Sequence, residues 1–159
     1  MVQLEESRNV VLAGKWSTAD KTCGGCHLFD KAFQEKEDKC TWSQNPQFIL
    51  KLNTQELTSV KITLSRPEKV WKKQVGLNLV GSMIGFYVYP ANEQPDKDKI
   101  LNREGTKFIP WNEINEELEL DGSPDGYIIM PATYEPEIQG PFVLSLSTDV
   151  EFTLTQQIF

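Results

Sequence analysis

The sequence predicts an all-β fold, an antiparallel sandwich or barrel. Apolar residues recur at every second position in several short stretches, which is the pattern of a half-buried strand, whereas the 3.6-residue period of a helix is nearly absent. Turn signals rich in proline, glycine and asparagine separate these stretches, and no helix of crossover length lies between them. The strands are therefore expected to pair antiparallel in a single domain spanning residues 1–159.

Six stretches carry the strand pattern. In chain order they are Phe48–Leu52, Val60–Ser65, Met83–Tyr89, Gly126–Met130, Phe142–Ser147 and Val150–Thr155. Asn45-Pro46 gives the first of them a rigid, extended start, because proline restricts its own backbone and that of the residue before it. Gly85 inside the third indicates a bulge or a close backbone approach, and Pro131 is expected to close the fourth at a sheet edge.

Two further segments could form short helical turns. They are Asp30–Asp38 and Trp111–Leu118. Neither is long enough to organise a fold, since helices of this length are marginal without tertiary support. At most short helical turns are therefore expected beside the strands.

The chain is acidic, with 23 Asp and Glu against 16 Lys and Arg and a formal net charge of −7. Such a charge repels phosphate backbones and argues against nucleic-acid binding. No stretch approaches the roughly 18 apolar residues of a membrane span, and the N-terminus lacks the regions of a signal peptide. The three cysteines are an odd number, which suits a reducing compartment better than a disulfide framework. A cytoplasmic location is expected.

The most conspicuous local motif is Cys23-Gly24-Gly25-Cys26-His27. It matches the C-x-x-C-H signature of haem attachment, but such proteins normally have a small helical fold and a second axial ligand. A thioredoxin-type redox pair needs a preceding βαβ unit, which is missing. Zinc held by Cys23, Cys26, His27 and Cys40 is a better alternative, although Cys26 and His27 point apart on an extended chain. The favoured interpretation is a glycine turn flanked by buried thiols, with no cofactor.

A catalytic site is not expected in this chain. A cysteine nucleophile needs a histidine that faces it from elsewhere in the fold, and His27, the only histidine, is the direct neighbour of Cys26. The fragment Gly14-Lys15-Trp16-Ser17 breaks the phosphate-binding loop pattern because Trp16 intervenes after the lysine. The chain alone is therefore expected not to be an enzyme.

Four loop carboxylates are candidate ligands for calcium. They are Asp96, Asp98, Asp121 and Asp125. Ca²⁺ takes several oxygen ligands, and loop ends can bring such oxygens together. Solvated turns with interleaved lysines are the competing explanation.

A basic and aromatic cluster stands out on the otherwise acidic chain. It consists of Arg66, Lys69, Trp71, Lys72 and Lys73. Such a cluster suits the headgroups of anionic phospholipids or an acidic strip on a partner protein. An ordinary exposed strand flank is the competing explanation, with Trp71 facing the core.

Six segments occur in an order that is specific to one family. They are Trp16-Ser17, Gly24-Gly25-Cys26, Trp42–Phe48, Ile84–Tyr89, Gly126–Pro136 and Gly140–Leu144. In this order they closely resemble calpain domain III, the β-sandwich that follows the papain-like protease core in calpain large subunits. The resemblance spans about residues 14–149 and implies an antiparallel eight-stranded β-sandwich. No segment corresponds to the catalytic cysteine, histidine and asparagine of the protease core.

The resemblance implies a noncatalytic regulatory or targeting domain that contacts the protease core in cis and partner proteins. Well-studied Ca²⁺-regulated members carry a dense acidic run after the Asn-Pro-Gln strand, whereas the segment Leu52–Leu57 here holds a single carboxylate. In this respect the chain is similar to the atypical calpains, some of which work with endosomal sorting proteins. The alternative is a Ca²⁺-dependent module that binds anionic phospholipid, which would recruit a cytoplasmic protein to membranes.

Overall fold

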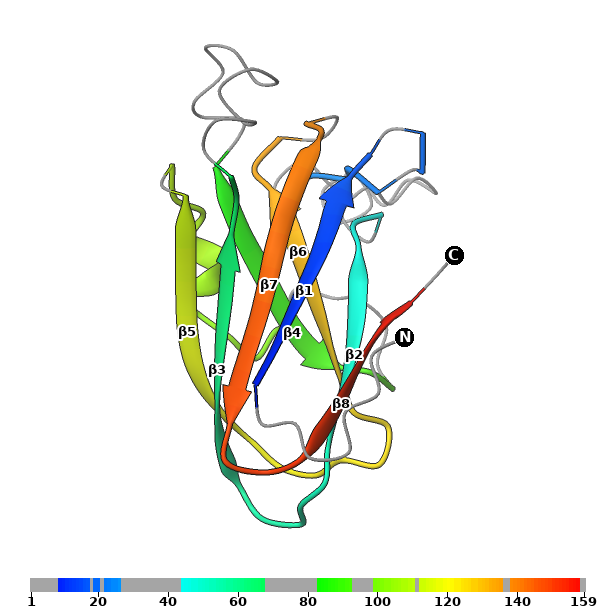
Figure 1. The fold of residues 1–159 in the computed structure, drawn as a ribbon, viewed down its shortest axis with the longest axis vertical. Coiled ribbons are helices and arrows are strands. Elements are labelled where there is room, and N and C mark those ends of the chain that lie inside the picture. The colour runs from blue at the N-terminus through cyan, green and yellow to red at the C-terminus, as the bar shows by residue number, and fades with distance from the viewer. Residues whose placement is uncertain are drawn as a thin grey trace.

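The computed structural model describes most of the chain, and the described residues form eight strands (Figure 1). The described residues are 9–17, 19–20, 22–26, 44–67, 83–92, 99–110, 112–135 and 138–157. The strands are β1 (Asn9–Trp16), β2 (Gln47–Leu52), β3 (Thr58–Ser65), β4 (Ile84–Pro90), β5 (Glu113–Leu120), β6 (Tyr127–Thr133), β7 (Gly140–Thr148) and β8 (Phe152–Gln157).

These strands form a sandwich of two four-stranded sheets, with the orders β1-β7-β3-β5 and β4-β6-β2-β8. Every pair of neighbouring strands is antiparallel. The predicted all-β sandwich is confirmed, and the one helical element in the described ranges is the 3-10 turn η3 (Gly105–Lys107). None of the helical structure described there is long and apolar enough to cross a membrane.

The main core lies between the two sheets. The indole ring of Trp16 packs against Phe142 with ring centroids 4.5 Å apart, and Phe142 meets Phe48 edge-on at 6.2 Å. Trp16 Nε1 donates a hydrogen bond to the carbonyl of Pro131 at 3.1 Å, so the polar end of the buried indole has a partner. β3 shows the alternation expected for a strand with one buried face.

A second apolar cluster covers the outer face of the β4-β6-β2-β8 sheet. It consists of Cys26, Tyr87, Tyr89, Phe108, Ile128, Met130 and Ala132. Phe108 belongs to the segment that follows β4. Its ring centroid lies 5.8 Å from that of Tyr87 and 6.1 Å from that of Tyr134. As a result, β4 and β6 are buried on both faces, at nearly every position.

The predicted helical turn at Trp111–Leu118 is wrong, because the chain forms strand β5 from Glu113 to Leu120. β5 pairs with β3 along its whole length, from Thr58 opposite Leu120 to Ser65 opposite Glu113. Its period-two pattern is interrupted by Glu116, a carboxylate on the inward face. Glu116 accepts hydrogen bonds from the backbone N–H groups of Arg103 (2.9 Å) and Gly105 (2.7 Å). The other predicted turn, Asp30–Asp38, lies outside the described residues.

Pro131 does not close its strand at a sheet edge, because β6 is an interior strand that continues to Thr133. β2 pairs with β6 only from Tyr127 to Ile129, so Pro131 lies beyond the last of these pairs. The close backbone approach predicted at Gly85 is confirmed. A Cβ atom there would lie 2.5 Å from the carbonyl oxygen of Gly105.

Candidate functional site

The Cys23–Cys26 segment is a buried turn held by backbone and side-chain hydrogen bonds. Gly25 has a φ of 77°, in the left-handed region that glycine adopts without strain. The buried Asn45 side chain spans the turn: its Oδ1 accepts the N–H of Gly24 (3.1 Å) and its Nδ2 donates to the carbonyl of Gly25 (2.9 Å). The N–H of Cys26 donates to the carbonyl of Tyr134 at 3.1 Å.

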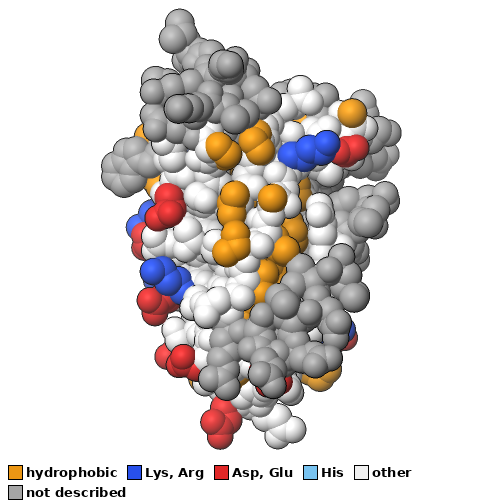
Figure 2. All heavy atoms as spheres, in the orientation of Figure 1, with side chains coloured by type: hydrophobic (Ala, Val, Ile, Leu, Met, Phe, Trp, Pro, Cys, Tyr) orange, Lys and Arg blue, Asp and Glu red, His pale blue; other side chains and the backbone are white. Residues whose placement is uncertain are grey.

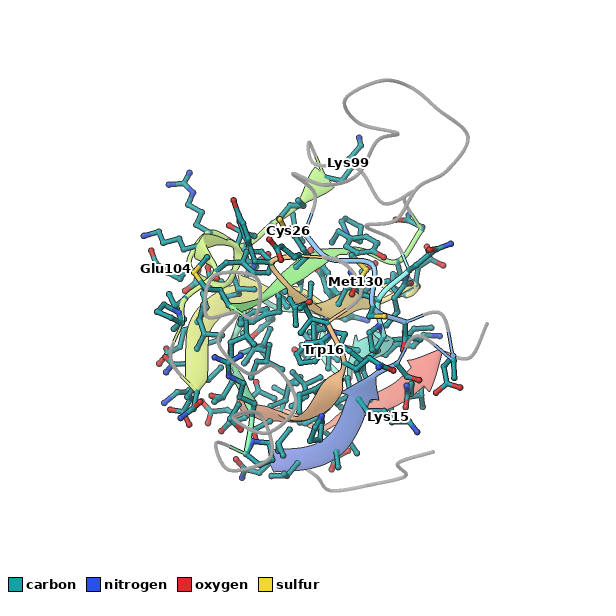
Figure 3. The ribbon with its side chains drawn as sticks, turned by 90° about the horizontal axis from the view of Figure 1, so that it is seen from above. Lys15, Trp16, Cys26, Lys99, Glu104 and Met130 are labelled. Atoms are coloured by element: carbon teal, nitrogen blue, oxygen red, sulfur yellow. The ribbon has the colours of Figure 1, made fainter. Side chains whose placement is uncertain are left out.

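The two thiols of this turn pack into different apolar clusters. Cys23 belongs to the core between the sheets, and Cys26 to the cluster on the outer face of the second sheet. Figure 3 shows Trp16 at the end of β1, with Cys26 and Met130 lying on the side of the second sheet. Both cysteines are buried. This burial is what the glycine-turn interpretation predicts, while His27 and Cys40 lie outside the described residues.

Three loops meet at the lower end of the sandwich in Figure 1. Gly122 leaves no room for a Cβ atom against the carbonyl oxygen of Thr54, so the loops after β5 and after β2 are in direct contact. The N–H of Asn53 donates to the carbonyl of Glu151 at 2.8 Å, which joins the loop after β2 to the loop after β7. Two of the predicted calcium ligands, Asp121 and Asp125, lie in this group of loops.

Asp121 is bonded to a tyrosine at the start of β6. Its Oδ1 accepts the hydroxyl of Tyr127 at 2.5 Å, and the Tyr127 oxygen accepts the N–H of Asp121 at 3.2 Å. Burial and the hydrogen bond to Asp121 together raise the pKa of Tyr127 to about 12. Asp125 is exposed, and Asp96 and Asp98 lie outside the described residues.

The described side chains do not assemble a metal site. Within the ranges that the structure describes, no three His, Cys, Asp or Glu residues lie close enough together to hold a metal ion. The calcium site proposed from Asp96, Asp98, Asp121 and Asp125 therefore stays a prediction.

Arg66, from the predicted basic cluster, is buried at the end of β3. Its Nη2 donates to the carbonyl of Pro110 (3.0 Å), and its Nε donates to Asn112 Oδ1 (3.4 Å). The N–H of Arg66 also donates to the carbonyl of Asn112 at 2.9 Å. Burial lowers the pKa of Arg66. These bonds join the end of β3 to the segment before β5, so Arg66 has a structural role here. Lys69, Trp71, Lys72 and Lys73 lie outside the described residues, so a lipid or partner site there stays a prediction.

The outer face of the β1-β7-β3-β5 sheet divides into an apolar part and an acidic part. Over β1 and β7 hydrophobic side chains gather in a surface that we call the apolar band, made of Val11, Ala13, Pro141 and Val143 (Figure 2). At the far edge, β5 exposes the three carboxylates of Glu113, Glu117 and Glu119. Sequence reasoning missed this surface because β1 and β5 were not among the predicted strands. The alternation of Ile114, Leu118 and Leu120 with glutamates was the available signal.

Comparisons with known proteins agree with this architecture. The family model of the calpain large subunit, domain III, matches residues 12–146. Human Calpain-9 is 29% identical over 150 residues, a match that covers 86% of this chain and 19% of that protein. The calpain-type cysteine protease DEK1 of Arabidopsis thaliana is 29% identical over 154 residues, which cover 89% of this chain and 7% of the relative.

A relative of another enzyme class also matches. The serine/threonine-protein kinase 4 homolog B of Dictyostelium discoideum is 28% identical over 146 residues, covering 86% of this chain and 11% of that protein. The chain thus spans less than a fifth of the length of these relatives, at most 19%. Because the family model matches most of the chain and the fold is the implied sandwich, the chain belongs to the calpain large subunit domain III family.

Proposed function

We propose that this chain is a noncatalytic domain that regulates or targets a calpain-type intracellular cysteine protease through contacts with the protease core and with partner proteins. Membership of the domain III family carries the proposal. Two features support it: Cys23 and Cys26 are buried in apolar clusters, and Asp121 is bonded to Tyr127. Related sequence also occurs in a protein named as a kinase, which fits a module whose catalysis resides elsewhere.

The acidic face of β5 suits contact with a basic surface of the protease core or a partner. Glu113, Glu117 and Glu119 are exposed at alternate positions of an edge strand. Lys61, on β3, lies opposite Glu117 in the register, so the carboxylates outnumber the cations on this face. Complementary charge speeds association and selects partners more than it adds affinity.

Binding of the chain to the parent protein's protease core, produced as a separate polypeptide, tests the proposal. The chain is expected to bind the core and to change its rate of peptide cleavage. Reversing the charges at Glu113, Glu117 and Glu119 should weaken this binding most at low salt, because exposed charges are screened within about 10 Å at 0.1 M salt. Thr153→Lys on β8 is the matched surface control. A chain that neither binds the core nor changes its rate of peptide cleavage would contradict the proposal.

The alternative, Ca²⁺-dependent binding to phospholipid, is favoured by one observation. Leu57 is 67% exposed in the loop after β2, at the same end as Asp121 and Asp125. An exposed leucine beside acidic loops could enter a lipid surface once calcium offsets the charge. Calcium titration by calorimetry and co-sedimentation with anionic vesicles test this function. Saturable calcium binding that carries the domain onto vesicles, with this vesicle binding lost in Asp125→Asn and Leu57→Ser, would favour the phospholipid-binding function over the regulatory one.

A further inference from the structure

Among the described strands, four lie at sheet edges, β1, β4, β5 and β8, and they are protected unequally. An edge strand presents unpaired N–H and C=O groups, which natural proteins cover, charge or interrupt. β4 is covered: Asn102 Oδ1 accepts the N–H of Val88 (2.8 Å), and Asn102 Nδ2 donates to the carbonyl of Phe86 (2.9 Å). Ile84 and Ile109 exchange two more backbone bonds, of 3.0 and 3.1 Å.

β5 is protected by charge. Its outward side chains include Glu113, Glu117 and Glu119, so a second strand of like charge would be repelled. The inward carboxylate of Glu116 also holds the segment at Arg103 and Gly105 against this edge.

β1 has no such protection within the described ranges. It pairs with β7 at all eight positions, from Asn9 opposite Ser147 to Trp16 opposite Gly140, and no described strand pairs with its other edge. Lys15, near the end of the strand, is its single charged residue. Val11 is 70% exposed and Ala13 is exposed, and both belong to the apolar band seen in Figure 2.

We propose that this edge is a self-association surface, at which two copies of the chain pair antiparallel through β1. Residues opposite each other in such a pair point to the same face. A pairing centred on Leu12 therefore places Val11 opposite Ala13 and Asn9 opposite Lys15. The small Ala13 accommodates Val11, no like charges stand opposite each other, and the two Leu12 side chains meet over the core. This self-complementarity favours a second copy over a partner of different sequence.

The charge distribution of the whole sheet also favours this pairing. Joining β1 to β1 produces one continuous sheet with the acidic β5 strands at its two ends. Seven strand spacings of about 4.8 Å separate these ends by about 34 Å, several times the screening length of about 8 Å at physiological salt. The uncharged edge of β8 offers Thr153 and Thr155 on its outward face, without an apolar band. β8 is therefore the control edge.

Analytical ultracentrifugation of the 159-residue chain over a wide range of concentrations tests this inference. A monomer–dimer equilibrium is expected. Val11→Lys should raise its Kd at least about tenfold, or about 1.4 kcal/mol, since the new lysine approaches Lys15 of the second copy. Thr153→Lys on β8 should leave the Kd unchanged. Both positions are exposed, so both variants should keep the circular dichroism of the parent chain; Ala13→Lys is a second β1 variant with the same expected effect.

A double variant tests the register itself. In Val11→Lys/Ala13→Glu the new lysine of each copy faces the new glutamate of the other, so dimerisation should return. A chain that stays monomeric at every concentration, or a dimer that Val11→Lys and Ala13→Lys leave intact, overturns the proposal. Loss of the dimer in Thr153→Lys also overturns it, by assigning the contact to β8. Failure of the double variant to restore the dimer overturns the pairing centred on Leu12. The readout is mass, so protease regulation and lipid binding are judged separately.

Discussion

Asn45 illustrates how one buried side chain determines the path of a loop. Its amide bonds both Gly24 and Gly25, so the turn that carries the two cysteines is held against the start of β2. Sequence reasoning assigned Asn45 only a local role, as the residue before Pro46. Its bonds to a distant loop could not be predicted, because they depend on which segments the fold brings together.

Tyr127 is expected to make the stability of the chain depend on alkaline pH. Its pKa is raised from 10.0 to about 12, so the folded chain retains the phenolic proton after the unfolded chain has lost it. The contribution to stability is fully present below about pH 10 and is lost as the pH rises through about 12. Absorbance titration should therefore show a late-titrating phenol in the parent chain whose contribution is missing in Tyr127→Phe.

The same variant serves as the control for stability. Between the two pKa values, urea midpoints should fall more steeply with pH for the parent chain than for Tyr127→Phe. Equal slopes, or a phenol that titrates near its ordinary value at this position, would contradict the role assigned to the bond with Asp121.

At the scale of elements, the side chain of Asn102 occupies backbone hydrogen-bonding groups at the edge of β4. Replacing it in Asn102→Ala leaves the buried N–H of Val88 and carbonyl of Phe86 without the partners that the side chain supplies. An unsatisfied buried polar group costs about 1–3 kcal/mol. The free energy of unfolding should fall by about that much, and the Val88 amide should exchange with deuterium faster.

Asn115→Ala is the matched control, because Asn115 is exposed on β5. Its effect should stay within about 0.5 kcal/mol, as for most surface substitutions. An Asn102→Ala variant that unfolds like this control, with unchanged exchange at Val88, would show that the edge of β4 does not depend on the amide.

The strands that the sequence predicted are those with clear alternation of apolar and polar residues. The two strands that were not predicted, β1 and β5, lack this alternation. In β1, the outward residues Val11 and Ala13 are as apolar as the inward ones, so no period of two is visible. In β5, the inward Glu116 breaks the alternation, while Ile114 and Leu118 are spaced as on a helix. The anomaly in β5 is a side chain whose partners, Arg103 and Gly105, lie on another segment, and a local pattern does not contain that information.

At the scale of the whole molecule, the two apolar clusters share the strands β4 and β6. Neither cluster can lose its packing without exposing a face of the same two strands. We therefore expect residues 1–159 to unfold as a single cooperative unit. Tryptophan fluorescence, to which the buried Trp16 contributes, and far-ultraviolet circular dichroism should give coincident urea transitions.

A substitution in the outer cluster sharpens this test. Phe108→Ala removes a ring that packs on Tyr87 and Tyr134, and should lower the free energy of unfolding by about 3 kcal/mol for both probes alike. Two separate transitions, or a loss seen by one probe alone, would divide the chain into independent units.

The candidate surfaces were less predictable than the fold. The apolar band joins β1 to β7, which are neighbours in space although they lie near opposite ends of the described chain. Arg66 was expected on a surface by its charge, and its burial depends on acceptors at Pro110 and Asn112 that only the pairing of β3 with β5 brings near. Strand order decides which side chains share a surface, and composition does not reveal strand order.

The double burial of β4 and β6 bears on how this sequence can diverge. Strands with one solvent face can exchange every second residue at little cost, so their sequences drift while the core positions hold. β4 and β6 have almost no solvent-exposed positions, because the outer cluster covers the face that would otherwise contact solvent. The segments Ile84–Pro90 and Tyr127–Thr133 should therefore be the slowest-changing parts of the domain, for reasons of packing.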